Sequence, residues 1–459
     1  MSVISPASER RIRRAIRKEV TRGTTPASPV YDVVPKLPGS FLQSTRNQEV
    51  SNVSRGDRQD GQIIGGTRAN AGTVKTPIAY EAAILTLMES ALSNTFGNKL
   101  TSGAITGTFA ASGSTFTRAA GDFTTAAVTA KLKIGDKVAV TGTASQGDAL
   151  NGAIDASVTT LTVDSTSKFP SSGAVVVGSE WISYTSKTST TFTGCTRGAF
   201  GTTAATHADN VVVDPVKTIT NITSTVLTFS EACTNESSIS TTFTANRKQL
   251  FSGTSRQYYT DEQYFADLDT YEVYDGQEIN TMQVTIPTSG EASIDFASVG
   301  LGVNFSQVAS STYTDVLGNT PCAGSVTGST LLVDGTALTT CIETIQLSIN
   351  NNRAAKFGVG SADACLVEEG SFDAEDQFTA YFADTTQRTK FQNGTRFSKE
   401  IRVRDQNAGH GFNFCFPRLV YRTNQKATSG QTVSEQFTAY AERDPTIGSK
   451  FYIELVIAA

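Results

Sequence analysis

One stretch of this chain, from Tyr271 to Phe305, most constrains what it can fold into, because apolar and polar side chains alternate on both sides of a turn at residues 287–290. Period-two alternation around a turn that contains proline and glycine predicts a β-hairpin with one buried face. The side chains expected on that buried face are Met282, Val284, Ile286, Ala292, Ile294 and Phe296.

A two-stranded hairpin is only marginally stable in water, so this one needs further strands beside it. Runs with the same alternation occur later in the chain, at residues 345–349, 412–416 and 451–457. We therefore expect a mainly β fold whose main body is a β-sandwich or barrel.

The chain has 459 residues, which is long enough for two or three domains. Charged residues make up 18% and the formal net charge is -5, so the protein as a whole lacks the charge of a general nucleic-acid binder. No run is apolar enough to span a bilayer, and the basic N-terminus lacks the apolar core of a signal peptide. We expect synthesis in the cytoplasm and no membrane partner.

The N-terminal residues 1–23 are strongly basic. Ile12, Ala15, Ile16 and Val20 fall at helical spacing, which predicts a basic amphipathic helix. Such a segment is a solvated arm that orders on assembly, a contact for an acidic neighbouring subunit, or a nucleic-acid contact. The basic residues of this candidate inter-subunit arm are Arg10, Arg11, Arg13, Arg14, Arg17 and Lys18.

The clearest helix is predicted over residues 77–96. Thr76 is the expected cap, Pro77 suits the first turn, and Gly97 ends the helix. A wide apolar stripe along it predicts packing against a sheet face. The stripe consists of Tyr80, Ile84, Leu87 and Ala91, with Leu85, Met88 and Leu92 beside it.

Changes in composition suggest the domain boundaries. Residues 1–36 form the basic arm, and residues 37–99 hold a long loop followed by the helix. Residues 100–235 are Thr-rich with short strand patterns, which predicts an inserted β domain. Within it, residues 145–213 have a small apolar core of their own and predict a nested β-module. Residues 236–459 return to the main β domain.

The sequence contains none of the motifs that usually carry catalysis: no nucleophile elbow, P-loop, dinucleotide fingerprint or HExxH. Only two histidines, His207 and His410, are present, so a His-based zinc site is not expected. We predict a protein that is not an enzyme, with no cofactor and no metal.

Two features leave alternatives open. The acidic stretch 257–278 is either an exposed acidic face or, less simply, a metal site, although it lacks EF-hand spacing. The six cysteines are expected to be mostly buried small hydrophobes in a cytosolic protein. A disulfide between Cys322 and Cys341 stays open as an alternative.

Several of these segments resemble the tail tube proteins of long-tailed bacteriophages. They are DGQEINTMQVTIP and SGEASIDFASVGLGV within the central hairpin, CIETIQLSINNNRAAKFGVGS at 341–361, GSFDAEDQFTAYFADTT at 370–386 and FNFCFPRLVYRTNQKATSGQ at 412–431. The nested module is similar to a small β-module of phage virion proteins, through TTLTVDST, VGSEWISYT and GTTAATHAD.

The resemblance implies a tail-tube fold with one flanking helix and a structural role in the virion. Subunits of that family form hexameric rings that stack into a hollow tube, through which DNA passes without specific binding. It also implies partners among the tape-measure, terminator and distal tail proteins, and assembly in the host cytoplasm. The alternative is a β-rich fibre, adhesin or other virion decoration protein that binds host-surface carbohydrate.

Applied to this sequence, the resemblance gives candidate sites. The tube wall is expected at residues 281–297, 341–350, 372–383, 412–422 and 435–457. The loop 37–75 is the candidate ring-to-ring contact, and the inserted domain lies outside, where host contact is an option. Candidate lumen acids are Asp295, Asp373, Glu375, Asp376, Glu435 and Glu442.

Overall fold

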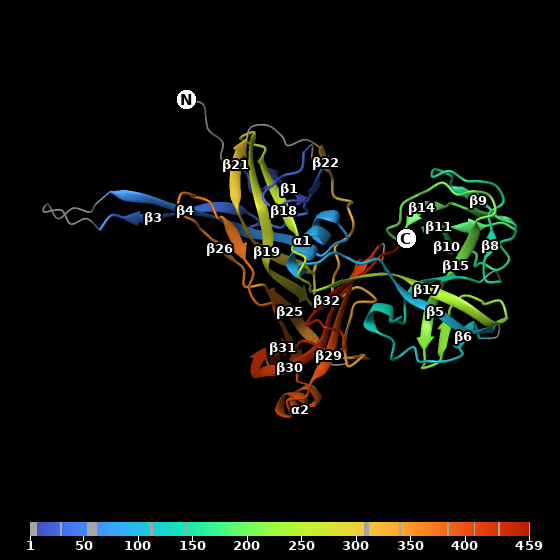
Figure 1. The fold of residues 1–459 in the computed structure, drawn as a ribbon. Helices are drawn as coiled ribbons and strands as arrows, with labels where there is room; N and C mark the ends of the chain where they lie inside the picture. Colours follow the sequence, from blue (N-terminus) through green and yellow to red (C-terminus); the bar gives the residue numbers. More distant parts are fainter. Residues whose placement is uncertain are drawn as a thin grey trace. The chain divides into compact units, whose positions relative to one another are not determined.

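The computed structural model describes residues 7–27, 30–52, 62–110, 113–143, 145–306, 312–338, 341–382, 385–407, 409–429 and 432–458. The chain divides into two compact units. Unit 1 comprises Met1–Phe96, Leu250–Asn407 and Gly411–Ile453, and unit 2 comprises Gly97–Gln249, Ala408–His410 and Glu454–Ala459. Both units consist mainly of β-strands, which confirms the predicted fold class (Figure 1).

Unit 1 is organised around the long strand β19 (Thr270–Pro287). Its first half pairs with β18 (Tyr258–Phe265) and β21 (Gly302–Ser306). Its second half pairs with β20 (Ser293–Gly300) and β25 (Ile342–Asn350). The predicted hairpin and the first of its predicted neighbours are therefore confirmed, with Met282 opposite both Phe296 and Ile349.

A continuous antiparallel sheet extends from this hairpin in both directions. On one side β20 pairs with β4, and β4 pairs with β3. On the other side β25 is followed in order by β28, β31, β30, β29, β23 and β24. These strands are β3 (Leu42–Val50), β4 (Ile63–Pro77), β23 (Thr330–Val333), β24 (Thr336–Ala337), β28 (Asp373–Tyr381), β29 (Phe397–Arg404), β30 (Gly411–Ser429) and β31 (Thr432–Ala441).

The first half of β19 belongs to a second layer of strands. There β18 pairs with β1, β1 with β2, and β2 runs parallel to β22. The bounds are β1 (Ile12–Glu19), β2 (Val30–Val33) and β22 (Thr312–Thr314), after a short 3-10 turn at Glu9–Arg11. A separate small hairpin joins β26 (Ala354–Lys356) to β27 (Leu366–Glu368).

The core of unit 1 is the one that the alternation predicts. All six predicted inward side chains of the central hairpin are buried. The repeated pentapeptide QFTAY occurs in β28 and β31, which are adjacent strands of one sheet with Phe378 opposite Phe437. These two rings stack with centroids 5.3 Å apart, so the repeat builds one aromatic pair across adjacent strands.

The flanking helix is shorter than predicted. Helix α1 spans Ala82–Leu92, whereas Thr76 and Pro77 belong to β4, because the pairing of β4 with β20 continues to Pro77. The helix ends at Ser93, which adopts a left-handed conformation with φ of 49°. Its predicted stripe is buried at Ile84, Leu87 and Ala91, together with Met88 and Leu92. A second helix, α2 (Thr386–Gln392), was not predicted and buries none of its residues.

Unit 2 contains a closed antiparallel barrel. Its strands pair in the order β5, β6, β16, β15, β7 and β17, and β17 pairs back to β5. Closure removes exposed sheet edges, and aromatic side chains such as Phe109, Phe116 and Phe243 fill the interior. The strands are β5 (Lys99–Ala110), β6 (Thr115–Arg118), β7 (Lys137–Thr141), β15 (Val212–Ile222), β16 (Val226–Phe229) and β17 (Glu236–Phe251).

The predicted nested module forms a second, separate core within unit 2. Its strands pair in the order β8, β15, β10, β11 and β14, and a small sheet adds β9, β13 and β12. The apolar cluster includes Phe169, Ile182, Tyr184 and Phe192. The remaining bounds are β8 (Asp148–Ala149), β9 (Thr160–Thr162), β10 (Gly173–Val177), β11 (Glu180–Tyr184), β12 (Ser186–Lys187), β13 (Thr191–Thr193), β14 (Thr196–Ala199), β32 (Tyr452–Val456) and a 3-10 turn at Val128–Ala130.

The cysteines and histidines have structural surroundings. All six cysteines are free, with Cys322 buried and Cys341 exposed, so the alternative of a disulfide between them is wrong for this structure. His207 contacts the carboxylate of Glu180 at 2.7 Å. His410 Nδ1 accepts a hydrogen bond from the backbone N–H of Ala458 at 3.1 Å.

Candidate assembly surfaces

The central sheet of unit 1 exposes a polar face. Because side chains alternate along each strand, the residues between the buried apolar positions all project from the other side. Directly opposed positions on neighbouring strands form rows of uncharged side chains across this face. One row contains Thr285, Gln346, Gln377 and Thr438, and all four are partly exposed.

Three of the six candidate lumen acids lie beside these rows, and each has a basic neighbour. Asp295 is 3.7 Å from Lys75, and Glu375 is 3.6 Å from Arg422. Asp373 is 3.4 Å from Lys450 and accepts hydrogen bonds from Tyr440 and Asn352. Although partial burial opposes it, these hydrogen bonds hold the pKa of Asp373 below its ordinary value.

The remaining exposed candidate, Glu442, lies just beyond β31. Its carboxylate accepts hydrogen bonds from Arg396 at 3.0 Å and from Arg418 at 2.8 Å. These hydrogen bonds lower the pKa of Glu442. Each of these four partly exposed acids therefore has a basic partner within the subunit. Exposed pairs of this kind contribute little to stability, but they set the local charge of the surface.

Two candidate acids are not on the surface. Asp376 is fully buried and pairs with Lys399 at 2.6 Å. Glu435 is buried and pairs with Arg388, whose Nε donates to it at 3.1 Å. The sequence-based assignment of these two as lumen acids is corrected, because each occupies an inward position of its strand, where a charged group needs a partner.

The basic N-terminal segment is a strand and not a helix. Residues 12–19 form β1, which is paired along its whole length with β18. Arg14 is fully buried in this layer, where its Nε and Nη2 donate to Asp261 at 2.9 and 2.7 Å. The helical spacing of Ile12, Ala15 and Ile16 is equally met by a strand covered on both faces, and all three are buried.

Most of the other arm residues are also engaged inside unit 1. Arg13 lies over the ring of Tyr313 at 3.6 Å, and Lys18 pairs with Glu89 at 2.8 Å. Arg17 donates to the carbonyl of Val30 at 3.2 Å. Arg11 pairs with Asp267, while Arg10 is exposed.

The acidic stretch 257–278 is the partner of these basic residues. Asp261, Glu262 and Glu278 are buried, which contradicts the prediction of an exposed acidic face. The physical reason is that β18 pairs directly with β1, so acids and arginines separated by more than 200 positions in the sequence meet in one layer.

The predicted loop 37–75 is largely a long β-hairpin of β3 and β4. Figure 1 shows this hairpin, in blue, extending away from the other strands of unit 1. Its base is tight: a Cβ at Gly72 would lie 2.1 Å from the carbonyl oxygen of Phe41. Toward its outer end the aliphatic side chains of Val50, Ile63 and Ile64 are all more than half exposed.

A buried ionic cluster joins the layers of unit 1. The carboxylate of Glu278 on β19 is fully buried and accepts two hydrogen bonds from Arg256, whose Nε and Nη2 lie 2.9 and 2.7 Å away. Arg22 is 2.8 Å and Arg353 is 3.4 Å from the same carboxylate. Burial lowers the pKa of both Arg22 and Arg353, and the nearby carboxylate of Glu278 opposes this shift.

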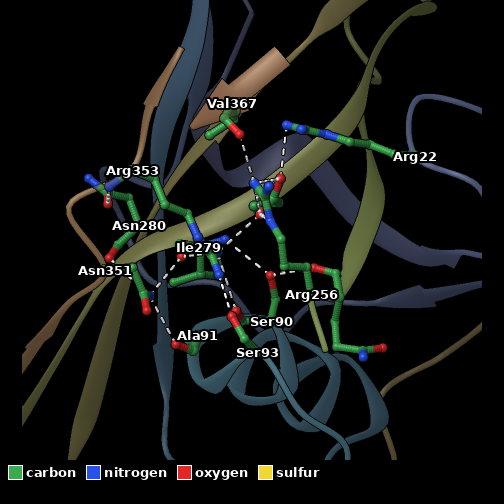
Figure 2. A network of polar contacts seen from close by, with 12 residues as sticks. Arg22, Ser90, Ala91, Ser93, Arg256, Ile279, Asn280, Asn351, Arg353 and Val367 are labelled. Carbon is green, nitrogen blue, oxygen red and sulfur yellow. Dashed lines mark hydrogen bonds and ion pairs between the residues drawn. The ribbon is translucent and has the colours of Figure 1, made fainter. Parts of the chain in front are cut away.

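The same cluster fixes the end of helix α1. Figure 2 shows Arg353 and Asn351 directed at the last turn of the helix. Asn351 Nδ2 donates to the carbonyl of Ala91 at 2.9 Å, and Arg353 Nη1 donates to the carbonyl of Ile279 at 2.6 Å. The side chains therefore donate hydrogen bonds to a carbonyl group at the end of the helix and to one beside the register shift of β19.

Sequence reasoning did not find this cluster. The only signal was Glu278 itself, a charged residue at the start of an otherwise apolar strand pattern. Arg22, Arg256 and Arg353 lie in turns and loops far apart in the sequence, so no spacing rule connects them. Lys399 offers a similar sequence signal of a buried charge, because it occupies an inward position in the alternation of β29.

Comparison with known families now adds to this geometry. The model of the family described as phage tail tube protein matches residues 10–441. The chain belongs to this family. Membership makes it a structural component of the phage virion and implies assembly with other tail proteins, and it favours a role other than catalysis. A search of curated proteins finds no match.

Within the part of the chain that the structure describes, neither helix is long and apolar enough to cross a bilayer.

Proposed function

We propose that this chain is the major tail tube subunit, that it forms hexameric rings, and that the rings stack into a hollow conduit for the phage DNA. The observation that carries this proposal is a pair of surfaces on unit 1 of the kinds that a tube subunit needs. One is a broad polar sheet face, and the other is a projecting hairpin with exposed aliphatic side chains.

The sheet face suits a wall past which DNA slides. Its central rows are Gln, Thr and Ser side chains, and its acids are Asp295, Asp373, Glu375 and, at the margin, Glu442. DNA binds proteins mainly through cations that contact its phosphates. In this proposal the cations Lys75, Lys450 and Arg422 are held by acids of the same face, so they do not retain the DNA.

The β3–β4 hairpin suits a contact between rings. Within the described part of the subunit, the side chains of Val50, Ile63 and Ile64 stay more than half exposed to water. Burying them against a second copy stabilises assembly by the hydrophobic effect, at about 25 cal/mol for each Å² covered. We also propose contacts with tape-measure, terminator and distal tail proteins at the tube ends.

Negative-stain electron microscopy of the purified chain at rising concentration tests the proposal. The expected result is six-fold rings and hollow tubes. The double variant Ile63→Ser/Ile64→Ser is expected to form rings that fail to stack, whereas the matched variant Ile134→Ser/Val212→Ser, which changes exposed aliphatic residues of unit 2, forms tubes normally. Isolated monomers or trimers at every concentration, even with tube seeds present, would overturn the proposal.

A further inference from the structure

One lysine–aspartate pair lies in the core of unit 1, where such pairs are rare. Asp376 occupies an inward position of β28, between the buried residues Ala374 and Phe378. Lys399 occupies an inward position of β29, between Phe397 and Ile401. Both side chains are fully buried, and Lys399 Nζ lies 2.6 Å from Asp376 Oδ2. Among the described residues, no other lysine–carboxylate ion pair has both side chains fully hidden.

The surroundings of this pair are aromatic and buried. Lys399 Nζ lies 4.1 Å from the centre of the Phe378 ring. The ring of Tyr421 packs nearby against Phe397 at 4.5 Å and Phe437 at 5.0 Å. Asp376 Oδ1 is buried and finds no hydrogen-bond donor within the described part of the chain. A carboxylate in such a site is poorly solvated, so its charged form is disfavoured.

The electrostatics push both groups toward their neutral forms. Burial raises the pKa of Asp376, and burial lowers the pKa of Lys399. The attraction between the two charges opposes these shifts, and transfer of one proton from the ammonium to the carboxylate makes both groups neutral. After that transfer the pair consists of a nucleophilic amine beside a carboxylic acid.

We propose that Lys399 and Asp376 join to form an intramolecular amide bond between β28 and β29. The lone pair of Nζ attacks Cγ of the protonated carboxyl group, and the new N–C bond forms as one C–O bond breaks. The departing hydroxyl takes a proton from the nitrogen and leaves as one water molecule. No electrons are exchanged with an oxidant or reductant, so the two side chains supply every atom of the reaction.

The geometry favours this condensation over reaction with solvent. A nitrogen that is 2.6 Å from one carboxyl oxygen lies close to the carboxyl carbon. Reacting groups about 3–3.5 Å apart and held in place react far faster than the same groups free in solution. The product amide is uncharged, so its formation also removes the desolvation cost that the buried ion pair carries.

The bond closes the chain between positions 376 and 399, a segment that contains α2. A cross-link of this kind restricts the unfolded chain and therefore stabilises the folded one, as a disulfide does. Unlike a disulfide, the amide is not broken by cellular reductants. It would tie two strands of the unit that we propose as the tube wall.

Mass spectrometry of the purified full-length chain tests the proposal directly. The expected intact mass is lower than the sequence mass by one water molecule. After digestion, trypsin does not cleave at the amidated Lys399, and a branched peptide joins the segments that contain Asp376 and Lys399. The variant Lys399→Arg is expected to keep the full mass. The matched variant Lys390→Arg, at a partly buried lysine paired with Asp334, is expected to keep the loss.

An intact mass equal to the sequence mass, with normal cleavage after Lys399, would overturn the proposal and leave an ordinary buried ion pair. A water loss that persists in Lys399→Arg would also overturn it, because another site would then carry the modification. If Lys399→Arg fails to fold, the peptide masses of the wild-type chain still decide between the two outcomes.

Discussion

Replacing Glu278 by glutamine should destabilise unit 1. Glutamine keeps the size of the side chain but removes its charge. Arg256, Arg22 and Arg353 then face one another without the carboxylate that they share. Arg353 is fully buried and has no route to water, whereas Arg22 and Arg256 remain partly exposed and relax toward solvent.

The expected magnitude follows from this difference in exposure. Removing one partner of a buried ion pair typically costs about 3–5 kcal/mol, because the other charge stays desolvated. Since two of the three arginines reach water, we expect the lower end, about 3 kcal/mol. For a unit of this size that corresponds to a fall of about 5 °C or slightly more in the midpoint of thermal unfolding.

Scanning calorimetry of Glu278→Gln and of a control variant, Glu291→Gln, measures the effect. Glu291 suits the control because it is an exposed carboxylate in the turn between β19 and β20. The control is expected to unfold like the wild type. A cycle with Arg256→Gln should show coupling of about 0.5–3 kcal/mol between positions 256 and 278. Equal midpoints for Glu278→Gln and Glu291→Gln would refute the view that Glu278 holds the layers together.

Two further predictions concern unit 2. Glu180 is buried, and hydrogen bonds from Arg197, His207 and two backbone N–H groups outweigh the burial and lower the pKa of Glu180 to about 2. Because this pKa is depressed in the folded state, the stabilisation of about 3 kcal/mol is present above about pH 4.5 and disappears as the pH falls toward 2. Circular dichroism should show that the wild type loses stability as the pH falls through this window, whereas the stability of Glu180→Gln changes less with pH there. An acid transition that is the same in both proteins would count against this role of Glu180. A second variant lacks residues 149–212 and joins Asp148 to Val213, which are opposed in β8 and β15, through a Gly-Gly link. We expect this deletion to leave tube formation intact, because the nested core is separate from the barrel core. Loss of tubes by a folded deletion variant, scored by microscopy, would place the nested module in the wall.

The alternation of side chains was sufficient to predict the central part of the fold. In β19, β20 and β25 every second residue is apolar, and a one-residue shift in register would expose the whole apolar set. For that reason the buried face of the hairpin and the need for further strands followed from the sequence, whereas the residue partners of Met282, Val284 and Ile286 came from the structure. Helix bounds did not follow, because Thr76 and Pro77 suit a helix start locally, while their pairing with β20 keeps them in a strand.

The candidate surfaces were harder to predict, because the exposure of a charged residue depends on what lies opposite it. Asp373 and Asp376 are three positions apart in one strand, yet one is partly exposed and the other fully buried. The alternation assigns them to opposite faces, and this signal was available in the sequence. The buried partner of Asp376, Lys399, lies on another strand, and only the fold brings the two together.

The largest error came from treating two charged segments as independent. The basic residues 10–18 and the acidic residues 258–265 each looked like solvated surface when considered alone. A charge that is costly to bury singly becomes acceptable beside an opposite charge with good hydrogen-bond geometry, as Arg14 and Asp261 show. Opposite charge runs in separate strands of a β protein therefore deserve a test as a pair before either is assigned to a partner. Here that test leaves only Arg10 and the ion-paired Arg11 exposed among the basic residues at 10–18, so the β3–β4 hairpin is the stronger candidate for an assembly contact.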